Sequence, residues 1–221
     1  MSVNMFVPME VTLVDSMGSD SSVVDAARVS FSKRATEYTD EANDKLLSFL
    51  AREGHWSPFA HTALTVRCKV PLYLAAQLKK HQVGLTWNEV SRRYVTTAIE
   101  FYDNQDWHHV PDNKKQGRGN EVTESTKFKA VTGYQNSCQA AYGGYLYLVD
   151  KLNIAPEEAR SVLPQATMTE FVWTGSLMAF VRVIKQRSDP GAQLIAQQFA
   201  ALLADAIKDV YPKAYKVLME S

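Results

Sequence analysis

The densest group of chemically active side chains lies between Gln77 and Tyr94. Four cationic side chains, a histidine, a carboxylate and the Ser91 hydroxyl stand there beside several uncharged polar groups. Gly84 and the polar residues that follow it interrupt any apolar stripe with the 3.6-residue period of a helix. We therefore predict an irregular polar segment that belongs to a site, and the alternative is a solvated charged loop.

Further arginines could contribute to the same site. Arg160, Arg182 and Arg187 could each be an ordinary surface charge when taken alone. Arg92, Arg93, Arg160 and Arg187 could instead converge on a doubly charged anion, because planar guanidinium groups pair with phosphate oxygens. The 24 basic and 24 acidic residues balance, so a phosphorylated small molecule is a better ligand candidate than nucleic acid.

Sequence patterns of other catalytic classes are absent. The five histidines form neither an HExxH motif nor another spacing typical of metal ligands, so we expect no metal. There is no glycine-rich phosphate loop and no GxSxG motif. Cys68 and Cys138 are far apart and outside any CxxC pattern, so we expect packing residues and neither a disulfide nor a zinc site.

Hydrophobic periodicity predicts the elements that position these residues. An amphipathic helix is expected at 40–52, with Gly54 ending it and His55 just beyond. Alternation at 64–70 predicts a strand, and a helix that starts near Pro71 leads into the polar segment. The rest of the chain is expected to contain strands at 95–102 and 165–173, a long loop at 104–120, and helices at 121–152, from 156, at 177–187 and at 192–210.

Length and composition favour one domain. A chain of 221 residues with 46% hydrophobic residues can form one sizeable core. We predict a single α+β domain over residues 1–221, in which helices cover a small antiparallel or mixed sheet. No apolar run reaches the roughly 18 residues of a membrane span, and residues 1–10 lack the pattern of a secretory signal, so we expect a cytoplasmic protein without membrane contact.

Several short segments occur in an order and approximate spacing that resemble the flavin-dependent thymidylate synthases. They are AARVSF at 26–31, GHWSPFAH at 54–61, NEVSRRY at 88–94, EFY at 100–102, ARSVLP at 159–164 and WTGS at 173–176. Each segment is a weak indicator alone, whereas the ordered set spans most of the chain. The family signature Arg-His-Arg, seven residues and Ser is replaced here by Lys80-His81-Gln82, eight residues and Ser91. Lysine lacks the planar fork, Gln82 lacks the charge, and the extra residue must bulge the loop.

The resemblance implies a fold, an assembly and a reaction. The expected fold is of the thymidylate synthase-complementing type, in a homotetramer whose subunits share sites for FAD and dUMP. The expected reaction converts dUMP to dTMP, with methylenetetrahydrofolate as the one-carbon donor and FAD, reduced by NADPH, as the hydride carrier. A flavin that carries the chemistry would explain a polar site without an obvious nucleophile.

The resemblance also implies roles for matching positions. The expected dUMP contacts are Gln77, Lys80, Glu89, Val90, Ser91, Arg92, Arg93, Arg160 and Arg187. The expected FAD contacts are Ser57, Lys80, His81, Gln82, Glu89, Ser176, Met178 and Arg182, where the family more often has Asn and Arg in place of Ser176 and Met178. Arg187 matches the catalytic arginine that favours ionisation of the uracil ring. His55 matches a histidine close to folate.

Two other functions stay open at this point. The substitutions at Lys80 and Gln82 could leave a nucleotide-binding homologue without catalysis, which an assay of thymidylate formation would detect. A different flavin-dependent change of the pyrimidine, such as hydroxymethyl transfer, would be recognised by the mass of the nucleotide product.

Overall fold

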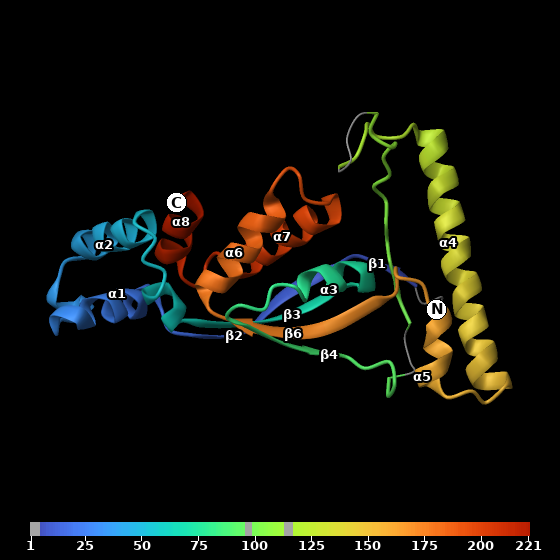
Figure 1. Cartoon of the computed structure of the whole chain (residues 1–221), viewed down its shortest axis with the longest axis horizontal. Coiled ribbons are helices and arrows are strands. Elements are labelled where there is room, and N and C mark those ends of the chain that lie inside the picture. Colours follow the sequence, from blue (N-terminus) through green and yellow to red (C-terminus); the bar gives the residue numbers. More distant parts are fainter. Residues whose placement is uncertain (1–4, 96–98, 113–116) are drawn as a thin grey trace. The chain divides into compact units, whose positions relative to one another are not determined.

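A computed structural model describes residues 5–95, 99–112 and 117–221 and has the predicted α+β class. The strands are β1 (Phe6–Val7), β2 (Glu10–Met17), β3 (Ala63–Pro71), β4 (Leu85–Glu89), β5 (Phe101–Tyr102) and β6 (Met168–Gly175). The α-helices are α1 (Asp20–Arg28), α2 (Asp40–Arg52), α3 (Leu72–Leu78), α4 (Glu124–Leu146), α5 (Pro156–Ala159), α6 (Leu177–Ser188), α7 (Leu194–Ile207) and α8 (Pro212–Glu220) (Figure 1). Short 3-10 turns occur at η1 (Val29–Phe31), η2 (Ala35–Glu37), η3 (Pro58–His61) and η5 (Arg160–Val162), and a π turn at η4 (Tyr147–Lys151).

The strands form two sheets. Four of them follow one another in the order β2, β3, β6 and β4, and β1 pairs in parallel with β5, with Phe6 opposite Phe101. Along β3, Leu64, Val66 and Cys68 are buried and alternate with less buried residues, as the sequence pattern predicts. None of the helices in the described part of the chain is long and apolar enough to span a membrane.

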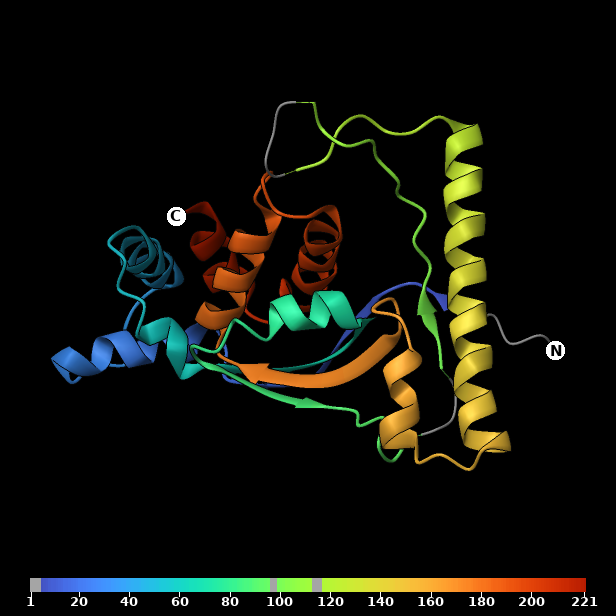
Figure 2. The ribbon, with the colours of Figure 1, turned by 45° about the vertical axis from the view of Figure 1, so that its right-hand side comes forward.

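Residue contacts divide the chain into two compact units. The first unit comprises Met1–Met9, Lys69–Leu78 and Glu89–Phe171. Its core contains Phe6, Phe101, Cys138 and Tyr145, and the rings of Phe6 and Phe101 lie 5.9 Å apart. Figure 2 shows α4 running alongside β5, so the long helix covers the small parallel sheet of this unit.

The second unit comprises Glu10–Cys68, Lys79–Asn88 and Val172–Ser221. Trp173 is its largest fully buried side chain. The Trp173 ring meets those of Trp87 and Phe180 edge-on, each at 5.5 Å between centroids. Phe199 on α7 completes this aromatic cluster, with its ring 6.5 Å from that of Trp173. The cluster therefore fixes β6, β4 and the helix pair α6 and α7 against one another within this unit.

Most predicted elements are confirmed, with corrections where side-chain periodicity is weak. The helix predicted at 40–52 is α2, and α4 with η4 accounts for most of the helix predicted at 121–152. The polar segment is only partly irregular, because its residues Leu85–Glu89 form β4. Of the strand predicted at 95–102, the structure has only Phe101–Tyr102, and residues 96–98 lie outside the described part.

Helix α8 has no counterpart among the predictions. Pro212 occupies its first turn, and the Asp20 carboxylate accepts hydrogen bonds from the backbone N–H groups of Ala214 at 2.7 Å and Lys213 at 3.3 Å. The cap therefore comes from a residue 194 positions away along the chain, which local sequence patterns do not reveal.

Candidate active site

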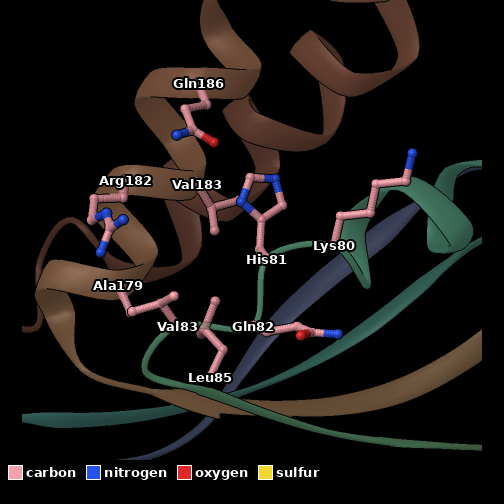
Figure 3. Close-up of a pocket in the computed structure, with 9 residues that line it drawn as sticks. All are labelled: Lys80, His81, Gln82, Val83, Leu85, Ala179, Arg182, Val183 and Gln186. Carbon is pink, nitrogen blue, oxygen red and sulfur yellow. The ribbon is translucent and has the colours of Figure 1, made fainter.

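One cavity in the second unit gathers predicted flavin contacts. It has a volume of about 170 Å³ and lies between the loop after α3 and one side of α6 (Figure 3). Its polar wall includes Lys80, His81, Gln82 and Arg182. Leu85 and Val183 contribute apolar surface. A small cavity with apolar sides and several hydrogen-bonding groups is suited to hold part of a polar ring system.

Two glycines allow the loop that lines this cavity to approach β6. Gly84 adopts a φ of +75°, a left-handed conformation that glycine adopts without strain. A Cβ atom on Gly175 would collide with the Gly84 carbonyl oxygen and with the Leu85 side chain. The Trp-Thr-Gly-Ser segment thus needs its glycine so that the loop backbone can lie against it.

Helix α6 begins directly after this contact. Ser176 caps the helix, because its Oγ accepts a hydrogen bond from the Ala179 N–H at 3.2 Å. Met178 lies in the first turn and is half-buried. In this structure Ser176 therefore stabilises the helix that carries Arg182 into the cavity wall.

Arg187, in the last turn of α6, contacts the same loop. Its Nε donates a hydrogen bond to His81 Nε2 at 2.9 Å. An accepting Nε2 carries no proton, so His81 is the neutral tautomer with its proton on Nδ1. Burial, followed by the charges of Arg187 and Arg182, lowers the pKa of His81 below its ordinary value, which favours this neutral form.

A second group of predicted residues lies in the first unit. Glu89 ends β4, and its Oε1 accepts a hydrogen bond from Thr169 Oγ1 at 2.7 Å. The Val90 N–H donates to the Glu170 carbonyl at 2.8 Å. A turn then begins at Ser91, whose Oγ accepts from the Arg93 N–H at 3.3 Å. The end of β4 is thus fixed to β6, and the residues after it project from that anchor.

Glu157 brings two predicted phosphate contacts together. Arg93 Nε donates to the Glu157 carboxylate at 2.9 Å, and Arg160 Nε donates to the Glu157 backbone carbonyl at 3.1 Å. Among described residues, no other group accepts a hydrogen bond from either guanidinium group. The terminal nitrogens of both arginines are therefore available to an anion.

Arg92 has different surroundings. It lines a separate cavity of about 190 Å³ with Lys69 and Glu100, whose charged groups lie 2.6 Å apart. Its Nη2 is 3.5 Å from the Met168 carbonyl oxygen, and burial lowers the pKa of its guanidinium group. The structure does not place Arg92 with Arg93 and Arg160 at Glu157.

The other predicted positions are not part of these groups. Gln77 is half-buried on α3 in the first unit. Ser57 is exposed at the start of η3. His55 is exposed, and its ring meets that of Phe49 edge-on at 5.8 Å. Among described residues no cluster of three or more His, Cys, Asp or Glu side chains could hold a metal ion.

Both cysteines are buried and lack the surroundings of a nucleophile. Cys68 is 0% exposed and Cys138 is 2% exposed. Burial raises the pKa of each thiol above its ordinary value. A raised pKa disfavours the reactive thiolate, so their surroundings are those of packing residues.

Sequence reasoning missed Glu157 and Thr169 as contributors to these groups, and it included Gly175 only as part of the WTGS segment, without a role. Glu157 could have been noticed from the local sequence. It follows Pro156, which starts a helix, and it lies three residues before Arg160. The contacts of Thr169 and Gly175 depend on strand pairing between distant segments.

Comparisons with known proteins agree on one family. The family model described as "Thymidylate synthase complementing protein" matches residues 12–213. A flavin-dependent thymidylate synthase from Pseudothermotoga lettingae is 36% identical over 207 residues, which cover 93% of this chain and 88% of that protein. A protein of the same name from Thermus thermophilus is 32% identical over 95% of this chain and 75% of its own length.

A solved structure shares the fold. The crystal structure of the UMP/dUMP methylase PolB from Streptomyces cacaoi, bound with 5-Br dUMP, superimposes with a TM-score of 0.86 at 24% identity. The match covers 99% of this chain and 97% of that chain.

Proposed function

The chain belongs to the thymidylate synthase complementing protein family, and from this premise we propose that it is a flavin-dependent thymidylate synthase. It converts dUMP to dTMP, with methylenetetrahydrofolate as the one-carbon donor and NADPH as the source of the reducing equivalents. The observation that carries the proposal is that four predicted flavin contacts line one cavity beside α6 (Figure 3).

FAD fits the donor set of that cavity. Lys80, Gln82 and Arg182 offer hydrogen-bond donors for the carbonyl and phosphate oxygens of a flavin nucleotide, and Leu85 and Val183 offer apolar surface for a ring. FAD held by these residues would supply the hydride-transfer chemistry of the reaction. The protein's own contribution is to bind and orient the reactants and to provide a positive field. Ser57, Glu89, Ser176 and Met178 are the remaining proposed flavin contacts.

Arg93 and Arg160 are the proposed ligands of the dUMP phosphate. Both are held through Nε at Glu157, so each can direct its terminal nitrogens at a phosphate oxygen. Ser91 would add a hydroxyl group next to Arg93. Gln77, Lys80, Glu89, Val90 and Arg92 are proposed to contact other parts of the nucleotide, and of these Val90 and Arg92 line the same cavity.

Arg187 is the proposed catalytic residue. A guanidinium group beside the uracil ring stabilises the negative charge that develops when the ring ionises, and this activates the carbon that accepts the one-carbon unit. His55 is proposed to lie close to folate, which its exposure at the end of α2 permits.

We also propose that subunits of a homotetramer share each site. A typical ligand pocket has about 300 to 1,000 Å³, and the flavin-contact cavity of one chain has about 170 Å³, so one chain would enclose only part of a dinucleotide. The family model extends over residues 12–213, which supports one functional domain over residues 1–221. A cytoplasmic location stays a prediction.

The decisive experiment supplies purified protein with FAD, NADPH, methylenetetrahydrofolate and dUMP and identifies the nucleotide product by mass spectrometry. The proposal requires dTMP that appears only when all components are present. A hydroxymethylated product would indicate the related transfer reaction. Flavin and dUMP binding without any product would identify a binding protein that has lost catalysis.

A further inference from the structure

The contact between His81 and Arg187 links two parts of the chain that are 106 residues apart. His81 lies in the loop that lines the flavin-contact cavity, and Arg187 lies in the last turn of α6. The hydrogen bond uses Arg187 Nε, the nitrogen closest to the aliphatic stem. The bond to His81 therefore restrains the guanidinium plane and does not itself use the two terminal nitrogens.

The contact depends on the protonation state of the ring. A protonated imidazole has N–H groups at both nitrogens and cannot accept from Arg187. The charged groups that act on the ring from the helix packed against it are Arg187 and Arg182, and Lys80 precedes it along the loop. A positive charge on His81 would thus remove the acceptor and repel Arg187.

We propose that neutral His81 is a positioning residue that holds the Arg187 guanidinium group for the nucleotide, and that protonation of His81 releases it. This role rests on the proposed function, because it assumes that Arg187 acts on dUMP. It also connects the two ligands, since the loop that lines the flavin-contact cavity sets the geometry of the arginine assigned to the substrate.

Two substitutions at His81 separate positioning from packing. His81→Gln keeps a carbonyl oxygen close to the position of Nε2, and this oxygen accepts from Arg187 without titrating near neutral pH. His81→Phe keeps a ring of similar size without an acceptor. His109→Gln is the matched control, because His109 is exposed in the loop before α4 and has no proposed role.

The turnover of the parent should fall at acid pH as His81 gains a proton. The pH profile of His109→Gln should show the same fall, which is its acid limb. His81→Gln should lack this limb while it binds dUMP within about threefold of the parent. His81→Phe should weaken dUMP binding by about tenfold, the scale of one hydrogen bond to a charged group, at flavin saturation. The proposal fails if His81→Phe, loaded with flavin, binds dUMP like the parent, or if the acid limb persists in His81→Gln.

A measurement on the free protein tests the contact without any activity. Nitrogen NMR of labelled histidine should show His81 with its proton on Nδ1 at neutral pH, and it does not require the phenylalanine variant to fold. A proton on Nε2 would overturn the positioning role and leave the proposed function intact. Failure of the parent to bind dUMP would overturn the proposed function and the role that rests on it.

Discussion

Replacing Glu157 by Gln tests the arrangement of the two proposed phosphate ligands. The amide oxygen of Gln can still accept from Arg93 Nε, and the backbone carbonyl that receives Arg160 Nε is unchanged. The substitution therefore removes one negative charge and preserves the geometry. We expect Glu157→Gln to bind dUMP more tightly than the parent.

The magnitude follows from two opposing effects. A phosphate dianion on the terminal nitrogens would lie about 6 to 7 Å from the carboxylate, where the repulsion is about 1 kcal/mol in water and about half of that at physiological salt. The side chains of Arg93 and Glu157 are 52% and 51% exposed. An ion pair this exposed stabilises the position of Arg93 by only about 0 to 1 kcal/mol. Because Gln retains the hydrogen bond, we expect a net gain of about twofold to fivefold in affinity.

Isothermal titration with dUMP at low and high salt measures this gain. The difference between parent and variant should shrink as salt rises, since screening removes the repulsion. Glu158→Gln is the matched control, because it removes the same charge from the neighbouring exposed position. Weaker binding by Glu157→Gln, or an equal gain in Glu158→Gln, would refute the reasoning.

Three further substitutions have defined outcomes. Arg187→Lys should lower kcat more than it raises KM, because a flexible point charge cannot replace a planar fork, and a change confined to KM would remove its activating role. Gly175→Ala should destabilise the protein by about 1 to 3 kcal/mol through overpacking and weaken FAD binding. In the control Gly133→Ala on α4, a Cβ atom meets nothing within 4 Å, so stability and FAD binding should be unchanged or slightly improved. Thermal melts and flavin titrations measure the two quantities. The double variant Cys68→Ala, Cys138→Ala should make dTMP within about tenfold of the parent rate after a stability loss of about 1 kcal/mol per site, and a folded, flavin-loaded but inactive variant would contradict a thiol-independent mechanism.

Local periodicity was sufficient for much of the fold. Helix α2 and strand β3 follow from spacing that places apolar residues on one face, and Gly54 ends α2 with a φ of +71° as expected. Strand β4 was missed because only Leu85 and Trp87 of its five residues are apolar and because it lies within a charged segment. Its strand conformation depends on pairing within the sheet, which overrides weak local preference.

The candidate site was predictable in its residues and only partly in its contacts. The sequence analysis singled out His81, Arg182 and Arg187, and the structure places all three on α6 and the loop beside it. The partnership of Arg93 with Glu157 spans 64 residues and could not be read from either segment alone. Contacts of this kind arise from the packing of distant elements, about which periodicity carries no information.

The division into two compact units has a consequence for the modularity of this protein. Each unit is assembled from three separate segments, so the backbone passes between them five times. No single cut in the gene separates the two units from each other, and a break at any point between residues 10 and 171 leaves both of them incomplete. We therefore expect the gene to be inherited as one unit and the chain to be expressed and degraded as a whole. Truncated chains should be unfolded and should not retain part of the function.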